Sequence, residues 1–385
     1  MSLMLASDDS PISLLESNDQ VGELCSFLDS IESIALDTEF IRTNTFYGRL
    51  GLIQLCDDQD CYLIDPLNIS DWDPLANLLK GTDIRTVCHS SSEDLNLLQT
   101  TINLIPTTIF DSQVAAAFLG IGFSLSYQAL VKLVLGKHIE KDVTRSDWLA
   151  RPLTERQLQY AADDVCYLLT LETCLREKLK QANKMEWFED ECANILINAQ
   201  GVENPSNWET CYSSISNSWK LKEEELECLQ QLCFWREVQA RERNKPKNWV
   251  AKDSDLLNLA LVFAGSSRVT MEALAEETRI DKGLLRKDGQ EILDLLKSSR
   301  YKLVPISRDL LNYPLGPSAR KKLKQCQVDV TEIAEKLSIA PELLARKRAL
   351  QKLIRDYEHT GQLIWSGELA GWRRGVLEDR FISLF

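Results

Sequence analysis

The stretch 34–40 (IALDTEF) most constrains what this 385-residue chain can fold into. Its first three residues are apolar and it contains neither Gly nor Pro, which predicts a buried β-strand. Side chains alternate between the two faces of a strand, so Asp37 and Glu39 point the same way, about 7 Å apart. Neighbouring carboxylates repel each other and burial raises their pKa values, so a fold retains such a pair when a cation lies between them. A solvated strand end explains this heptad equally well.

A second acidic segment follows another predicted strand, at 84–88. It begins with His89 and continues through three serines to Glu93 and Asp94, at a junction between strand and helix. The helix dipole alone favours acids in a first helical turn, which suffices to explain Glu93. Asp94 is placed to reach back toward the strand that carries Asp37 and Glu39.

A third segment, 154–164 (TERQLQYAADD), predicts a helix. Thr154 followed by Gln157 forms a capping box that fixes the start of this helix. Tyr160 and Asp164 are four residues apart and share one face, whereas Asp163 lies about 100° away and is expected to be solvated. Alone, a Tyr and an Asp at this spacing are more often a packing residue and a surface charge.

Together the three segments supply four carboxylates and a phenol. This oxygen-rich set suits two divalent cations, Mg²⁺ or Mn²⁺, better than zinc, because no His or Cys stands at ligand spacing. Two such cations can bind the attacking water and the leaving oxygen of a displacement at phosphorus, with Tyr160 positioning or deprotonating the water. A Ser/His/Asp triad is disfavoured, since only His89 of the three histidines lies near a candidate site and no nucleophile elbow is present.

The order of predicted elements indicates an α/β sheet covered by helices, followed by all-helical regions. We expect a strand and a helix within 12–33, the helix capped by Asn18 or Asp19. Further expected strands are 34–40, 51–56, 61–64 and 84–88, and further expected helices are 74–80, 93–100, 112–120, 124–135 and 155–180. Residues 201–218 are expected to form a linker, and a stretch rich in Pro, 301–317, divides the helical remainder.

Charge and cysteine content restrict the partners and the compartment. The net charge is −14, but it is unevenly distributed: residues 1–30 carry −6, whereas residues 301–385 carry +5. This distribution is compatible with a polyanionic substrate. The eleven cysteines show no CxxC or His/Cys clustering, which argues against a disulfide framework and favours a reducing cytoplasm. No signal peptide and no membrane span are expected.

The acidic motifs resemble those of the DEDD superfamily of exonucleases, in its Tyr-bearing branch. Asp37-x-Glu39, Asp94 and Tyr160-x-x-x-Asp164 match its three motifs. The segments 36–55, 92–95, 110–118 and 145–169 resemble the bacterial ribonuclease D family. The region after 219 resembles an HRDC domain, through Leu229, Trp235-Arg236, Arg241, Pro246, Val250, Asp253 and Leu256. The segment 305–385 resembles a second, divergent HRDC domain. Ser90-Ser91 departs from the Ala-Gly pair that is usual in the family.

The resemblance implies an RNase H-like exonuclease domain at 1–200, a linker at 201–218, an HRDC domain at 219–300 and a second HRDC-like bundle at 305–385. It also implies that Asp37, Glu39, Asp94 and Asp164 bind two divalent cations and that Tyr160 orients the water. The implied activity is a 3′→5′ exoribonuclease that matures tRNA and other small structured RNAs, acting as a monomer. The alternatives are a DNA 3′→5′ exonuclease and a non-catalytic RNA-binding scaffold.

Several residues near the motifs are candidates for contact with RNA through stacking or phosphate pairing. They are Phe40, Arg42, Gln54, His89, Lys141, Arg145 and Trp148, with Tyr47 and Arg151 as further possibilities. Phe40 is explained equally well as a core residue. The basic runs 320–324 and 346–348 have the composition of solvated helix faces, and phosphate contact is their functional alternative.

Overall fold

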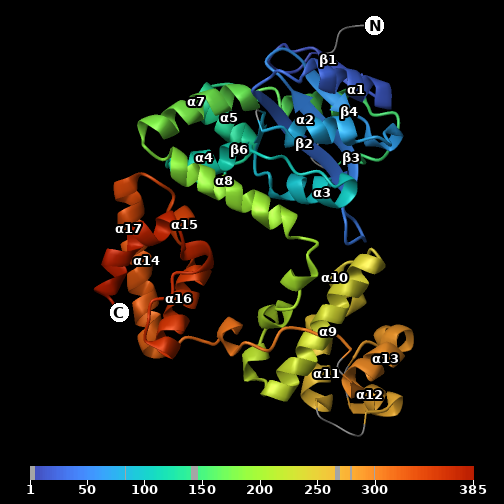
Figure 1. Ribbon diagram of the computed structural model, residues 1–385, viewed down its shortest axis with the longest axis vertical. Coiled ribbons are helices and arrows are strands. Elements are labelled where there is room, and N and C mark those ends of the chain that lie inside the picture. The colour runs from blue at the N-terminus through green and yellow to red at the C-terminus, as the bar shows by residue number, and fades with distance from the viewer. Residues whose placement is uncertain (1–4, 83, 140–145, 265–268, 278–279, 299) are drawn as a thin grey trace.

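The protein is described by a computed structural model covering residues 5–82, 84–139, 146–264, 269–277, 280–298 and 300–385 (Figure 1). The described part of the first domain contains a six-stranded sheet in the order β1-β4-β3-β2-β5-β6. Its strands are β1 (Ile12–Leu15), β2 (Ser33–Ile41), β3 (Arg49–Cys56), β4 (Cys61–Ile64), β5 (Arg85–Cys88) and β6 (Ile109–Asp111). The pairs β2–β3 and β3–β4 are antiparallel, and the other pairs are parallel. The sheet is therefore mixed, and the α/β sheet domain that the sequence predicts is confirmed.

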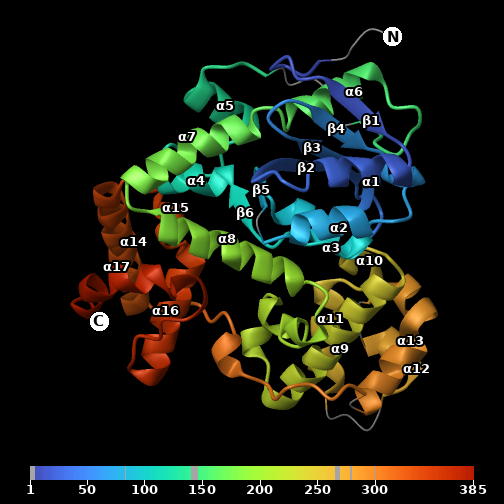
Figure 2. The same cartoon turned by 45° about the horizontal axis from the view of Figure 1, so that its top comes forward.

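Helices cover both faces of this sheet (Figures 1 and 2). They are α1 (Asn18–Phe27), α2 (Asp73–Lys80), α3 (Ser92–Ile102), α4 (Ser112–Phe118), α5 (Tyr127–Leu135), α6 (Glu155–Asp163), α7 (Leu168–Gln181) and α8 (Met185–Gln200), with a short 3-10 turn η1 (Pro66–Asn68). Ile34, Leu36 and Ile53 pack in one hydrophobic cluster with residues of α1, α2 and α3. Ala35 and Leu52, on the opposite face, pack in another cluster with α4, α5, α6 and α7. Alternate residues of β2 thus face two separate cores.

Three local predictions differ from the structure. Strand β6 was not predicted, because three residues are too few to show a period. The helix expected at 155–180 is two helices, α6 and α7, separated by a break at 164–167. Helix α1 is capped by Ser17, whose side chain accepts a hydrogen bond from the Gln20 amide, rather than by Asn18 or Asp19. A serine at this position satisfies a free amide of the first turn as well as an acid or an amide side chain does.

The first helical bundle contains α9 (Glu223–Glu242), α10 (Lys247–Val250), α11 (Asp253–Phe263), α12 (Met271–Glu277) and α13 (Lys282–Lys297) around the fully buried Trp235. The predicted linker, 201–218, contains the 3-10 turns η2 (Pro205–Asn207) and η3 (Cys211–Ser214) and leads into η4 (Ser218–Lys220). Its Tyr212 and Ile215 are buried in the bundle core. The second half of this segment is therefore packed in the bundle, whereas residues 204–207 are exposed.

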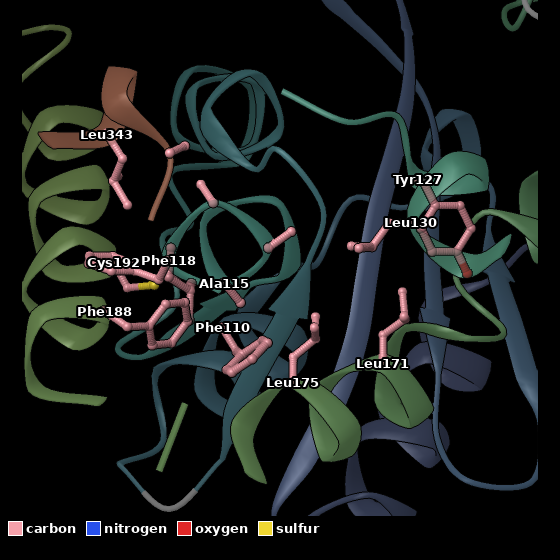
Figure 3. Packing of buried hydrophobic residues seen from close by; sticks show 14 of the residues in the cluster. Phe110, Ala115, Phe118, Tyr127, Leu130, Leu171, Leu175, Phe188, Cys192 and Leu343 are labelled. Carbon is pink, nitrogen blue, oxygen red and sulfur yellow. The ribbon is translucent and has the colours of Figure 1, made fainter. Parts of the chain in front are cut away.

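The second helical bundle comprises η5 (Arg308–Leu310), α14 (Pro317–Leu337), α15 (Pro341–Leu344), α16 (Lys347–Thr360), η6 (Gly367–Leu369) and α17 (Trp372–Ile382). It packs on α4 and α8 of the sheet domain, where Leu343 lies opposite Phe118, Phe188 and Cys192 (Figure 3). Lys184 donates hydrogen bonds to the carbonyls of Phe118 (2.8 Å) and Ser338 (2.9 Å), which joins the two parts. A continuous apolar core therefore links the sheet domain to this bundle.

The first helical bundle contacts the loop between β2 and β3. The side-chain oxygen of Asn244 accepts hydrogen bonds from the amides of Phe46 (3.0 Å) and Tyr47 (2.9 Å). The guanidinium of Arg241 lies over the ring of Phe46, 4.5 Å from its centroid. The strand that carries Asp37 and Glu39 thus continues into a loop held by a separate domain.

The state of the cysteines and the hydropathy of the helices can be read from the structure. All eleven cysteines fall within the described residues and are free thiols. No helix in the described part of the chain is both long and apolar enough to cross a membrane.

Candidate active site

Asp37 and Glu39 lie in the middle of β2, next to the centre of the sheet. In the antiparallel register, Asp37 is opposite Gln54 and Glu39 is opposite Leu52. The register shifts between Glu39 and Phe40, which marks a β-bulge at the end of the motif. Bulges bend a strand and redirect its side chains, and they are common beside active sites. The two carboxylates therefore project from one face of a strand that has neighbours on both sides.

Asp94 is in the first turn of α3 and is buried, with 8% of its surface exposed. The Thr38 hydroxyl donates a hydrogen bond to its carboxylate, which links α3 to β2 between the two acids of the first motif. Asp111, at the end of β6, fixes the turn before α3. Its carboxylate accepts hydrogen bonds from the Ser90 amide (3.1 Å) and from the Ser91 amide and hydroxyl (both 2.9 Å).

Asp111 was not among the predicted site residues. The buried Asp111 carboxylate positions the turn that precedes Asp94. It also caps α4 by accepting hydrogen bonds from the amides of Gln113 and Val114. Its only sequence signal is that it lies in the segment 110–118, which resembles the ribonuclease D family. This role depends on the parallel pairing of β5 with β6, where Cys88 is opposite Asp111.

Helix α6 carries Tyr160 and ends at Asp163, so Asp164 is its C-cap. The capping box between Thr154 and Gln157 is present as predicted. The Asp164 amide donates to the Tyr160 carbonyl (3.2 Å), which keeps the two residues one helical turn apart. Gln128 of α5 donates to the Asp164 carboxylate (3.2 Å). The buried Ala161 and Ala162 let α6 approach the sheet closely.

The four carboxylates are close enough to perturb one another. Burial, followed by the charges of Asp94, Asp164 and Glu39, raises the pKa of Asp37 well above its ordinary value. Burial and the charges of Asp164 and Asp94 raise the pKa of Glu39 to about 8. Burial also raises the pKa values of Asp94 and Asp164 to about 7 each. The structure therefore brings all three predicted acidic segments into one site.

This site has the electrostatics of a cation site. Among the described residues, none of the four carboxylates forms a salt bridge with Lys, Arg or His. No set of three His, Cys, Asp or Glu side chains in the described ranges is already arranged to coordinate an ion. Thr38 and Gln128 donate hydrogen bonds to Asp94 and Asp164. The four carboxylates repel one another, and a cation between them would offset that repulsion. Their oxygen donors fit Mg²⁺ or Mn²⁺.

Tyr160 borders this acidic cluster. Burial and the charges of Asp164 and Glu39 raise the pKa of the Tyr160 phenol, so the hydroxyl keeps its proton at neutral pH. Its ring contacts the indole of Trp148, with 6.1 Å between the centroids. Trp148 is itself buried, with 3% exposed, beneath Gly51 of β3. A Cβ at position 51 would come within 2.7 Å of Trp148, so only glycine fits there.

Arg151 holds this part of the chain to the sheet. Its guanidinium forms a bidentate salt bridge with the fully buried Asp65, which lies 86 residues away in sequence. It also donates to the carbonyls of Gly51 (2.8 Å) and Trp148 (2.9 Å). The role of Asp65 is not predictable from the sequence, because nothing local distinguishes it from the other acids of the segment 65–73.

Several of the residues predicted to contact RNA are buried or already bonded within the protein. Trp148 and Gln54 are buried in the sheet domain, so neither offers a surface to a nucleotide. The guanidinium of Arg151 is occupied by its salt bridge with Asp65. Gln54 has no hydrogen-bond partner for either side-chain atom among the described residues. Both ring nitrogens of His89 are engaged, by Ser112 (2.9 Å) and the Leu125 carbonyl (2.9 Å), and burial lowers its pKa.

Two candidates remain accessible near the site. Arg42 is half exposed and pairs with Glu93, the neighbour of Asp94. Phe40 is partly buried, with the Arg42 guanidinium 5.8 Å from its ring centroid. Lys141 and Arg145 lie outside the described residues.

Comparison with known proteins agrees with this geometry. Residues 12–180 match the 3′-5′ exonuclease family, and residues 225–296 match the HRDC domain. Ribonuclease D of Pseudomonas paraeruginosa is 37% identical over 343 residues, which cover 89% of each chain. Ribonuclease D of Escherichia coli is 34% identical over 373 residues, which cover 96% of this chain and 97% of the relative.

The crystal structure of Escherichia coli RNase D, described as an exoribonuclease involved in structured RNA processing, has a similar fold. It superposes with a TM-score of 0.83 at 32% identity, covering 97% of this chain and 98% of that one. The similarity therefore extends through the sheet domain and both helical bundles. Taken with the exonuclease match and the gathered acids, it shows that the chain belongs to the ribonuclease D family of 3′→5′ exoribonucleases.

Proposed function

We propose that this protein removes nucleotides one at a time from RNA 3′ ends and releases nucleoside 5′-monophosphates. In this proposal, Asp37, Glu39, Asp94 and Asp164 hold two divalent cations, Mg²⁺ or Mn²⁺. The observation that carries it is the convergence of carboxylates from β2, α3 and the end of α6, where the charges of Asp94 and Asp164 raise the pKa values of Asp37 and Glu39. When bound, two such cations supply Lewis-acid stabilisation of the attacking and leaving oxygens.

The remaining roles fall to the chain's own side chains. Tyr160 keeps its phenolic proton and is placed beside Glu39 and Asp164, so we assign it the orientation of the attacking water by a hydrogen bond. Thr38 and Gln128 orient the carboxylates of Asp94 and Asp164 by donating hydrogen bonds to them. Arg42, half exposed beside Asp94, is suited to pair with a phosphate of the terminal nucleotides.

The substrates we propose are precursors of tRNA and other small structured RNAs with single-stranded 3′ ends. The Escherichia coli relative is described as acting in structured RNA processing, and the present chain shares its domain order. We further propose that the protein acts as a monomer. We also propose that it acts in a reducing cytoplasm, since its eleven cysteines are free thiols.

The test uses an RNA hairpin with a 3′ overhang, labelled at its 5′ end. Wild-type protein with Mg²⁺ or Mn²⁺ is expected to give a ladder that shortens from the 3′ end, and EDTA is expected to abolish it. Asp37→Asn removes one charge without changing shape, and it should also abolish the ladder. Asp163→Asn is the matched control, because Asp163 is outside the cluster and accepts from Ser7 and Gln159. Binding of RNA by wild type without any ladder would instead identify a scaffold.

A matched DNA hairpin tests the choice of nucleic acid. We expect RNA to be degraded much faster than DNA of the same sequence under the same conditions. Equal or faster degradation of DNA would overturn the assignment of RNA as the substrate while leaving the metal site intact.

A further inference from the structure

One exposed aromatic side chain has no role in the fold or in the site described above. Trp249 of α10 has 62% of its surface exposed. All nine tryptophans lie within the described residues, and the other eight are buried or partly buried. The core of the first helical bundle is filled by Trp235, and Val250 is the residue of α10 that is buried in it. Packing therefore does not explain a tryptophan at position 249.

The segment around Trp249 is basic, although the protein as a whole carries a net charge of −14. Between positions 243 and 252 it contains Arg243, Lys245, Lys247 and Lys252 and no acidic residue. Arg243 is paired with Asp288, and Lys247 is paired with Glu237. Lys245 and Lys252 are exposed and form no salt bridge with any described residue. An exposed indole thus lies, within a stretch of eight residues, between two exposed lysines that form no salt bridge with the described residues.

This patch follows a residue that contacts the loop after the strand with Asp37 and Glu39. Asn244, the residue before Lys245, holds the β2–β3 loop through the amides of Phe46 and Tyr47. Both views place α10 at the end of the first helical bundle that faces the sheet domain (Figures 1 and 2). The β2–β3 loop follows the strand that carries Asp37 and Glu39. The patch is therefore attached to the domain that hydrolyses RNA.

We propose that Trp249, Lys245 and Lys252 bind single-stranded RNA on the 5′ side of the nucleotide being removed. A base would stack on the indole, and the two ammonium groups would lie near its flanking phosphates. Aromatic rings beside cations are the usual way in which proteins hold single strands without reading their sequence. Because the 3′-terminal nucleotide would occupy the carboxylate site, a contact outside that site would be made with nucleotides on its 5′ side. This inference rests on the proposed function.

RNA length provides the test. A trinucleotide is expected to be degraded equally by wild type and Trp249→Ala, because it occupies the carboxylate site alone. A 15-nucleotide single strand is expected to show a KM about 10-fold higher with Trp249→Ala and an unchanged kcat, the loss typical of one stacked base. Trp249→Phe keeps a stacking ring and is expected to retain most of the affinity.

Binding is measured separately by fluorescence anisotropy of the labelled 15-mer in EDTA, where no hydrolysis occurs. Trp249→Ala is expected to weaken binding by about 10-fold. The double variant Lys245→Gln/Lys252→Gln is expected to reduce the slope of log affinity against log salt by about 1.4, as for two phosphate contacts on a single strand. Phe27→Ala is the matched control, because Phe27 is 69% exposed on α1, among acidic residues.

Two results would overturn the proposal. If Trp249→Ala binds the 15-mer as tightly as wild type, the patch serves something other than RNA, such as a protein partner. If it slows the trinucleotide and the 15-mer equally, Trp249 acts through the fold or the carboxylate site. Failure of the proposed function looks different: wild type would then degrade neither RNA, whatever the variants do to binding.

Discussion

At the scale of single residues, the carboxylate cluster makes the metal-free fold less stable as pH rises. The pKa values of Glu39, Asp94 and Asp164 are about 8, 7 and 7 in the folded chain, against ordinary values near 4. The folded state therefore binds more protons than the unfolded state between these limits. This contribution to stability is complete below about pH 4 and is lost as pH rises through about 7 to 8.

We accordingly expect the melting temperature in EDTA to fall between pH 6 and pH 8.5. Mg²⁺ or Mn²⁺ should raise it, and by more at pH 8.5, because protons then compete less with the cation. Differential scanning fluorimetry across this range measures both effects. The double variant Asp37→Asn/Asp164→Asn is expected to show a smaller fall and no response to metal. A melting temperature in EDTA that rises with pH would contradict the predicted electrostatics.

At the scale of elements, α6 is positioned by contacts that precede it in the chain. The salt bridge between Arg151 and Asp65 anchors Trp148 beneath Gly51, and Trp148 contacts Tyr160. Gln157 of α6 also donates to the Asp147 carbonyl (3.3 Å) in the same turn. The start of α6, and with it the Tyr160 hydroxyl, is therefore set by a buried ion pair on the sheet.

Removing Arg151 should be costly because it leaves Asp65 buried and unpaired. We expect Arg151→Ala to lower the free energy of unfolding by about 3–5 kcal/mol in urea titrations and to reduce kcat through misplacement of Tyr160. Asp65→Asn combined with Arg151→Gln should recover part of that stability, since no buried charge remains.

Arg176→Ala is the control for this pair, because Arg176 is a partly exposed arginine 3.9 Å from Glu172. It should cost less than about 1 kcal/mol. Equal costs for Arg151→Ala and Arg176→Ala would show that the bridge to Asp65 does not anchor the turn.

At the scale of the whole molecule, the two helical bundles are attached differently. The first is held through the β2–β3 loop by Asn244 and Arg241. The second is joined by an extensive apolar contact and by Arg373, which is 6% exposed and forms a bidentate pair with Glu191 of α8. The stacked rings of Trp187 and Trp372, 4.9 Å apart, lie at the same junction.

Arg373→Ala is expected to loosen the second bundle from the sheet domain. Hydrogen exchange should then rise in α8 and α17, and the free energy of unfolding should fall by about 2–4 kcal/mol, because the partly buried Glu191 loses its cationic partner. Arg374→Ala is the neighbouring control: its side chain is 56% exposed and pairs with Glu378 one turn away, which is worth about 0.5 kcal/mol. Matching exchange in the two variants would show that Arg373 does not hold the junction.

Local patterns in the sequence determined the parts of the site that depend on short-range geometry. Strand alternation places Asp37 and Glu39 on one face of β2. The capping box fixes the start of α6, and the four-residue spacing of Tyr160 and Asp164 places them one helical turn apart. These relations hold within a few residues, so they survive without knowledge of the tertiary fold. The same is true of the division into a sheet domain and helical regions, which follows from the order of elements.

Only the tertiary structure decided which polar and aromatic residues are accessible. It buries Trp148 and Gln54, pairs Arg151 with Asp65, and uses Asp111 of the three-residue strand β6 to position Asp94. It also brings Asn244 to a loop 198 residues earlier in the chain. Such contacts depend on strand order and domain packing, which join distant segments whose local sequence carries no record of the pairing.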